Sequence, residues 1–196
     1  MLICALRPEL MAGITSLTPN LPDTRCAAWV DYDGAFVERT LIKFAIGFNN
    51  VSGRSLGYAP RARLLLWLND MPHDPFPELY RYISLHVVQA PWGKGVTWSA
   101  QPPWGDTKPV TRTYFDNQSA VDQSGIRDGT LGYYAWDVTA MVNGWLSGGN
   151  ENHGLLVKLE DESPDPLRRR SIGSSFGVNQ EGGAVVEHRP VLWIET

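Results

Sequence analysis

The stretch YYAWDVTAMVNGWLSGGNENHGLLVKL, residues 133–159, decides the fold class. It begins with aromatic and β-branched residues typical of a strand. Apolar residues then recur at positions 138, 141, 142, 145 and 146, which is the spacing of one helical face. An alternating pattern returns over residues 154–160 and predicts a second strand. A one-faced helix over 138–147 between two strands predicts a lid that covers an open end of a β-structure with Trp145 and Leu146.

The ends of this helix also have sequence signals. Asp137 or Thr139 can accept a hydrogen bond from the first free amide groups as the N-cap. Gly148 and Gly149 supply the left-handed turn that ends a helix. Gly144 lies inside the helix and costs roughly 1 kcal/mol relative to alanine. The helix therefore needs tertiary packing in order to form.

Outside this stretch the chain reads as short strands and turn-rich loops, with about eight or nine strands in all. The clearest strand covers residues 61–68, with its even-numbered residues inward and Trp67 outward. Further strands are expected at 26–30, 39–48, 82–89, 111–115, 171–178 and 190–195. Residues 8–24 are rich in proline and turn residues, so we expect at most one irregular edge strand there.

This pattern predicts an all-β fold, a jelly-roll-like antiparallel β-sandwich with one short helix near 138–147. No internal repeat or linker divides the chain. We therefore predict a single β-sandwich domain over residues 1–196, in which residues 1–14 form an N-terminal extension.

Composition excludes several classes of protein. The formal net charge of −4 gives no basic footprint for nucleic acid. No stretch has the apolar length of a membrane helix, so we predict no membrane insertion. The start MLICALRPELMAG has a short apolar run that Arg7 interrupts, and we predict a chain made without a signal peptide. Cys4 and Cys26 can form a disulfide or pack as two small buried hydrophobes.

Several short motifs follow one another along the chain: RTLIKF at 39–44, ARLLL at 62–66, VTW at 96–98, DVT at 137–139 and NHGLLVK at 152–158. Their order resembles the DNRLRE-type β-sandwich domain, which is similar to some carbohydrate-binding modules. The resemblance spans roughly residues 15–195. It implies a jelly-roll-like sandwich of extracellular, polysaccharide-associated proteins without intrinsic catalysis, and it implies no particular set of ligand residues.

The eight tryptophans are the main candidates for a binding surface. A sugar platform needs exposed rings, whereas Trp92, Trp98, Trp136, Trp145 and Trp193 fall at positions where core, lid or strand packing is expected. The remaining candidates for ligand or interface aromatics are Trp29, Trp67 and Trp104, together with Tyr58 and Tyr80 on loops. These rings can also pack under a loop or at a subunit contact, since aromatic residues are enriched at interfaces.

Metal and catalytic motifs are weak. The acidic run Glu160-Asp161-Glu162 with Asp165 can bind a hard cation such as calcium, but such a run is more often a solvated loop. The four histidines lack zinc spacing, and no Gly-x-Ser-x-Gly elbow surrounds the serines. We predict no catalytic residue, no metal site and no cofactor, with calcium at the acidic run as the alternative.

A complete sandwich without a catalytic set predicts a non-catalytic structural or attachment protein of a larger assembly. A virion component, such as a capsid decoration or fibre protein made in the cytoplasm, fits these features best. Outward apolar residues at Leu65, Trp67 and the Trp104 loop predict a homo-oligomer, with copies of the chain and a larger protein assembly as partners. The alternative is a carbohydrate-binding module of a surface or secreted polysaccharide-associated protein.

Overall fold

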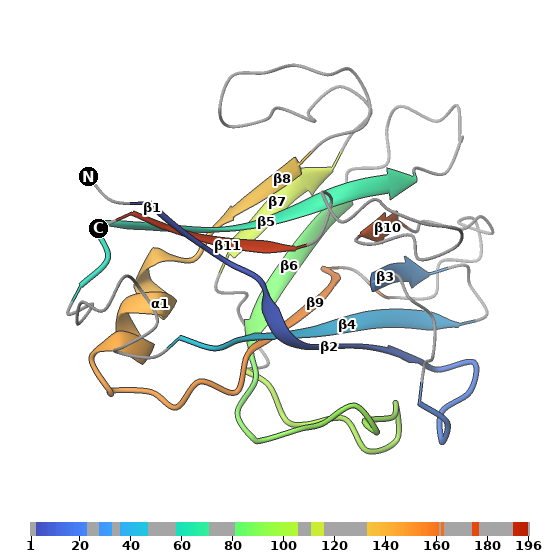
Figure 1. Ribbon diagram of the computed structural model, residues 1–196. Coiled ribbons are helices and arrows are strands. Elements are labelled where there is room, and N and C mark those ends of the chain that lie inside the picture. Colours follow the sequence, from blue (N-terminus) through green and yellow to red (C-terminus); the bar gives the residue numbers. More distant parts are fainter. Residues whose placement is uncertain are drawn as a thin grey trace.

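Two antiparallel sheets and one short helix make up the part of the chain that the computed structural model describes (Figure 1). The described residues are 3–22, 28–32, 36–46, 58–70, 81–105, 111–115, 133–160, 162, 174–176 and 190–195. This architecture confirms the predicted all-β sandwich with a single short helix.

The first sheet has the strand order β1 (Ile3–Leu6), β11 (Val191–Glu195), β5 (Arg61–Asp70) and β8 (Tyr133–Asp137). In the second sheet, β2 (Pro8–Thr15) pairs with one edge of β4 (Val37–Phe44). The rest of this sheet comprises β3 (Ala28–Tyr32), β9 (Leu155–Leu159), β6 (Arg81–Val87) and β7 (Thr111–Phe115). The short strand β10 (Ser174–Phe176) pairs with both β5 and β3, and it joins the two sheets along one side.

The main core lies between the two sheets. Ala62, Leu64 and Leu66 of β5 are fully buried there, as the alternation predicted for these positions. Ile42 and Phe44 of β4 meet them from the second sheet. The Trp136 indole Nε1 of β8 donates a hydrogen bond of 3.0 Å to the Ile83 carbonyl oxygen of β6. This bond spans the core, because β8 and β6 belong to different sheets.

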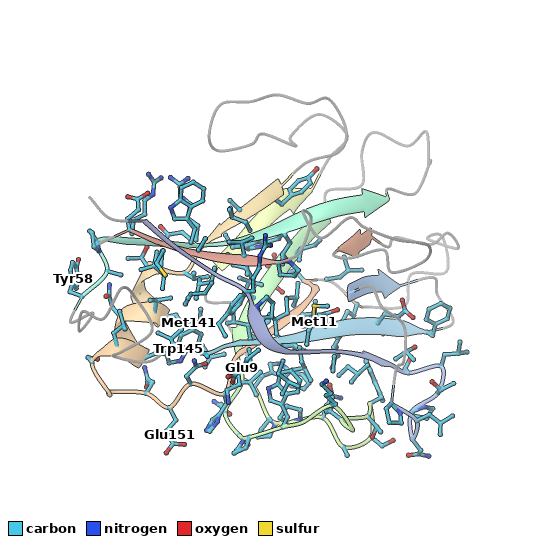
Figure 2. The ribbon with its side chains drawn as sticks, in the orientation of Figure 1. Glu9, Met11, Tyr58, Met141, Trp145 and Glu151 are labelled. Atoms are coloured by element: carbon cyan, nitrogen blue, oxygen red, sulfur yellow. The ribbon has the colours of Figure 1, made fainter. Side chains whose placement is uncertain are left out.

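Helix α1 (Thr139–Leu146) covers one end of the sandwich, as expected for a lid (Figure 1). Its buried residues are Met141, Val142, Trp145 and Leu146, and Figure 2 labels Met141 and Trp145 on the side of α1 that faces the sheets. The Asp137 carboxylate accepts the Thr139 amide at 2.9 Å, and this bond lowers the pKa of Asp137. Gly148 follows the helix with a positive φ of 72°, which agrees with the predicted glycine stop.

Two polar side chains of α1 hold the start of β5 and the residues directly before it. The Thr139 hydroxyl accepts the Ala62 amide at 2.9 Å. One turn later, the Asn143 side-chain amide accepts the Ala59 amide at 2.7 Å and donates to the Ala59 carbonyl at 2.8 Å. Residues four apart lie on the same face of a helix, so both contacts form at once. The helix is therefore fixed by hydrogen bonds as well as by its apolar face.

The N-terminal residues differ from the prediction. Instead of forming an extension over 1–14, residues 3–15 supply β1 to the first sheet and β2 to the second. The side chain of Met11 packs against the main core, whereas that of Ile14 is buried on the opposite face of the sheet. Because both faces are covered, the strand lacks the alternation that marks a half-buried strand. Cys4 is a free cysteine, and Cys26 lies outside the described residues.

Within the described ranges, no helix is long and apolar enough to cross a membrane.

Candidate functional site

The outer face of the second sheet is covered by the loop of residues 89–105, which we call the tryptophan loop (Figure 1). In Figure 1 this loop lies below β2 and β4, drawn in green. Ile14, Leu41 and Leu156 point to this face and form a second, smaller core with Val88 and Val96. Trp92, Trp98 and Trp104 of the loop pack against this core and are partly buried. The second sheet is thus covered on both faces.

One end of the tryptophan loop is fixed to the residues that precede β9. The Trp92 indole Nε1 donates a hydrogen bond of 2.7 Å to the His153 carbonyl oxygen. The Val88 amide donates to the Gly154 carbonyl at 3.0 Å. The Asn152 side-chain amide donates to the Phe44 carbonyl at the end of β4. These three bonds hold β4, β6 and the loop together at one corner of the sheet.

Arg39 of β4 is the centre of a polar cluster under the other part of the loop. Its guanidinium donates to both carboxylate oxygens of Glu162, with Nε–Oε1 at 2.9 Å and Nη2–Oε2 at 2.7 Å. Nη1 donates to Gln101 Oε1 at 2.8 Å. The guanidinium carbon lies 4.3 Å from the centroid of the Trp98 ring and 4.8 Å from that of Trp104. Arg39 therefore has hydrogen bonds in its plane and aromatic rings over it, a geometry that lysine does not reproduce.

A second cation stands beside this ion pair. The Lys158 Nζ lies 3.3 Å from Glu162 Oε2, so one carboxylate serves two cations. Burial lowers the pKa of Lys158, and the nearby Glu162 carboxylate partly opposes this effect. The side chains of Arg39, Glu162 and Lys158 are all largely shielded from solvent. A bidentate and shielded pair of this kind orders the groups that it joins more than an exposed pair does.

His86 and Ser84 of β6 complete the cluster. The His86 Nδ1 lies 2.9 Å from the Gly105 carbonyl oxygen, and its Nε2 lies 3.0 Å from Ser84 Oγ. A carbonyl oxygen only accepts, so Nδ1 carries the proton and Nε2 accepts from the Ser84 hydroxyl. Burial is the main cause that lowers the pKa of His86. Ser84 is fully buried, so this pair holds Gly105 at the end of the loop and does not present a hydroxyl to solvent.

The structure brings one of the predicted site residues, Trp104, into this cluster. Trp104 lies over Arg39. Tyr58 is 67% exposed and precedes the segment that α1 holds. Trp29 belongs to β3 and Trp67 to β5, and their side chains lie outside the described part of the chain. Tyr80 also lies outside it.

The acidic run is described only in part. Its Glu162 pairs with Arg39 and Lys158, whereas Asp161 and Asp165 lie outside the described residues. Among the residues that the structure does describe, no group of three histidine, cysteine, aspartate or glutamate side chains gathers in a metal-binding arrangement. The calcium alternative at this run stays a prediction.

Sequence reasoning missed the Arg39 cluster, although a signal for a covered outer face was present. Leu41 follows Arg39 on the face opposite to Ile42, and Leu156 lies between two inward residues of β9. Adjacent apolar residues in a strand indicate burial on both faces. Such runs predict that apolar side chains cover the outer face of the sheet. In this chain the three tryptophans of residues 92–104 supply that cover.

A comparison with protein-family models finds no match to this chain, and a search of curated proteins finds none either. The described fold and the Arg39 cluster define the class of protein: a β-sandwich with a helical lid, in which one sheet is covered on both faces.

Proposed function

We propose that the chain is a non-catalytic structural or attachment protein of a larger assembly and that it acts through protein contacts. One observation carries this proposal: the charged and aromatic groups of the Arg39 cluster bind each other. Trp98 and Trp104 each place a ring beside the Arg39 guanidinium. A sugar platform needs those ring faces open, and an ion site needs the carboxylate of Glu162 free. The cluster instead fastens a loop to a sheet, which suits a rigid building block.

The exposed apolar residues support the same proposal. Among the described residues, the exposed large hydrophobic side chains are Leu17, Leu21 and Tyr58. The two leucines, which are 64% and 62% exposed, lie on the turn that follows β2. An apolar group on an ordered turn binds a partner at a low entropic cost, because little freedom remains to be lost.

Hydrogen bonds keep this turn ordered. The Ser16 hydroxyl accepts the Val37 amide at 2.7 Å, and the Ser16 amide donates to the Val37 carbonyl at 2.9 Å. The Ser99 amide of the tryptophan loop donates to the Pro19 carbonyl at 2.8 Å. The turn and the tryptophan loop therefore support each other. A surface of this kind fits a capsid decoration or fibre protein of a virion, which is the finer form of the proposal.

A carbohydrate-binding module is the second candidate. The DNRLRE-type resemblance favours it, and so does the exposed ring of Tyr58. An exposed aromatic ring can stack on a sugar, although a single ring gives a small platform. Tyr58 is thus the residue whose removal separates the two proposals.

Native gel electrophoresis in the presence of soluble xylan, β-glucan or amylopectin tests the proposed function. We expect the wild-type chain to migrate at the same rate with and without each polysaccharide. The Tyr58→Ala variant is the matched control, because the side chain is exposed and its loss leaves the core intact. Retardation of the wild-type chain that Tyr58→Ala abolishes would overturn the structural proposal in favour of the carbohydrate-binding one.

A further inference from the structure

Strand β2 is an edge strand, and several of its side chains pack into the two cores. Among the described strands it pairs with β4 alone. Met11 packs against the main core, and Ala12 and Ile14 pack against the second core. Figure 2 labels Met11 on this strand, together with Glu9 near its start. The feature that β2 offers to a partner is therefore its backbone edge.

The hydrogen-bond phase of the β2–β4 ladder identifies the backbone groups on that edge. The Ser16 amide donates to Val37, and the antiparallel register continues without interruption back to Leu10. Backbone groups alternate between the two sides of a strand, so Ala12 and Ile14 point toward β4 like Ser16. The amides and carbonyls of Met11, Gly13 and Thr15 consequently point away from β4.

The two halves of this edge are protected unequally. Its start carries Pro8, the exposed Glu9 and a register irregularity between residues 8 and 10, which are all features that block edge pairing. Glu9 is also held by Lys43 at 3.1 Å. Residues 10–15, LMAGIT, contain no charge and no proline. An uncharged edge of this length is a ready template for another strand, and soluble proteins usually cover or charge such an edge.

We infer that β2 pairs antiparallel with β2 of a second copy of this chain, around a two-fold axis at Gly13. This register places Gly13 opposite Gly13 and Met11 opposite Thr15, so all three outward residues form hydrogen-bonded pairs. The strand is thus self-complementary in this register.

This inference rests on the proposed function and names one of its contacts, because it makes the second copy the first partner in the assembly. It also predicts a continuous sheet that runs through both copies.

Amide exchange measured by NMR at several protein concentrations tests the contact directly. Ala12 and Ile14 donate within the chain, and their exchange should be slow at every concentration. Met11, Gly13 and Thr15 should exchange slowly at high concentration and much faster on dilution. Sedimentation of the same samples should show twice the chain mass of 21.8 kDa at high concentration. A chain that sediments as a monomer at every concentration would overturn the inference.

The Gly13→Pro variant removes the amides at the axis, and Gly13→Ala is its matched control. We expect Gly13→Pro to weaken dimerisation roughly tenfold or more, because two hydrogen bonds are lost. If Gly13→Pro does not fold, the exchange experiment on the wild-type chain still decides. Outward amides that exchange slowly at every concentration would mean that the chain covers its own edge, and this would also overturn the inference. Neither outcome involves polysaccharide, so a failure here is distinct from a failure of the proposed function.

Discussion

Gly154, directly before β9, has a backbone conformation and a close neighbour that leave no room for a side chain. Its φ is +91°, and a Cβ atom built on it would lie 2.4 Å from the Ile42 carbonyl oxygen. We expect Gly154→Ala to lower the free energy of unfolding by about 3 kcal/mol, through a disfavoured backbone conformation and a clash with β4. Urea denaturation measures the loss.

Gly148→Ala is the control for this prediction. Gly148 also has a positive φ, but a Cβ atom there meets open space. Its loss should be about 1 kcal/mol, from the backbone conformation alone. Equal losses at the two positions would show that the close approach to Ile42 has no energetic weight.

His86 makes stability depend on pH. Its pKa in the folded chain is lowered, mainly by burial, from an ordinary value of 6.5. The unfolded chain therefore binds a proton at a higher pH than the folded chain does. Above the pKa that His86 has in the unfolded chain, the side chain is neutral in both states and does not lower the free energy of unfolding. Below that pKa the unfolded chain binds the proton more readily, so the free energy of unfolding falls as the pH drops toward the folded-state pKa. Lys158 and Arg39 act in the same direction, whereas Glu162 and the bond to Gly105 oppose the shift.

The His86→Gln variant isolates this effect. When the pH is lowered from 7.5 to 5.5, the urea midpoint should fall further for the wild-type chain than for His86→Gln. Glutamine keeps a hydrogen-bonding side chain at the site and does not titrate. The same fall in both proteins would assign the pH dependence to other groups.

At the scale of elements, helix α1 supplies a large aromatic anchor to the core. Trp145 is buried, and among the described residues its indole Nε1 has no hydrogen-bond partner. Trp145→Ala should cost about 3–5 kcal/mol, as for other buried large aromatics. Trp145→Phe should cost clearly less, because it keeps much of the ring and removes a buried N–H without a partner. Chemical denaturation measures both, and a loss below about 1 kcal/mol for Trp145→Ala would show that Trp145 is no lid residue.

The elements that the sequence predicted well are those with one buried face. Strand β5 and helix α1 have clear periodicity, and their buried residues match the prediction. For residues 8–24 the sequence predicted at most one irregular edge strand, and β2 is such a strand, with a register irregularity near its start. Its bounds and its two covered faces were not predicted, because a strand covered on both faces lacks alternation and because Pro8 and Gly13 resemble turn residues. The Arg39 cluster was also missed, since Arg39 lies 62 residues from Gln101 and 123 residues from Glu162. Long-range pairs of that kind leave no periodic signal.

At the scale of the whole molecule, the second sheet couples the two cores. Strands β4 and β9 give one face to the main core and the other to the core under the tryptophan loop. Strand β10 joins the sheets at one side, and Trp136 bonds across the middle. Loss of either core therefore exposes apolar surface on strands that the other core needs.

This coupling predicts a single cooperative unfolding transition for the wild-type chain. Tryptophan fluorescence, to which Trp92, Trp98 and Trp104 contribute, and far-UV circular dichroism, which reports the strands, should give the same urea midpoint. The Arg39→Ala variant should separate the two signals. Without the guanidinium, the two rings and the Glu162 carboxylate lose their common partner, so the tryptophan loop should detach before the sheets unfold. Coincident midpoints in Arg39→Ala would show that the apolar contacts of the loop hold it without the cluster, whereas separate midpoints in the wild-type chain would contradict the coupling of the two cores.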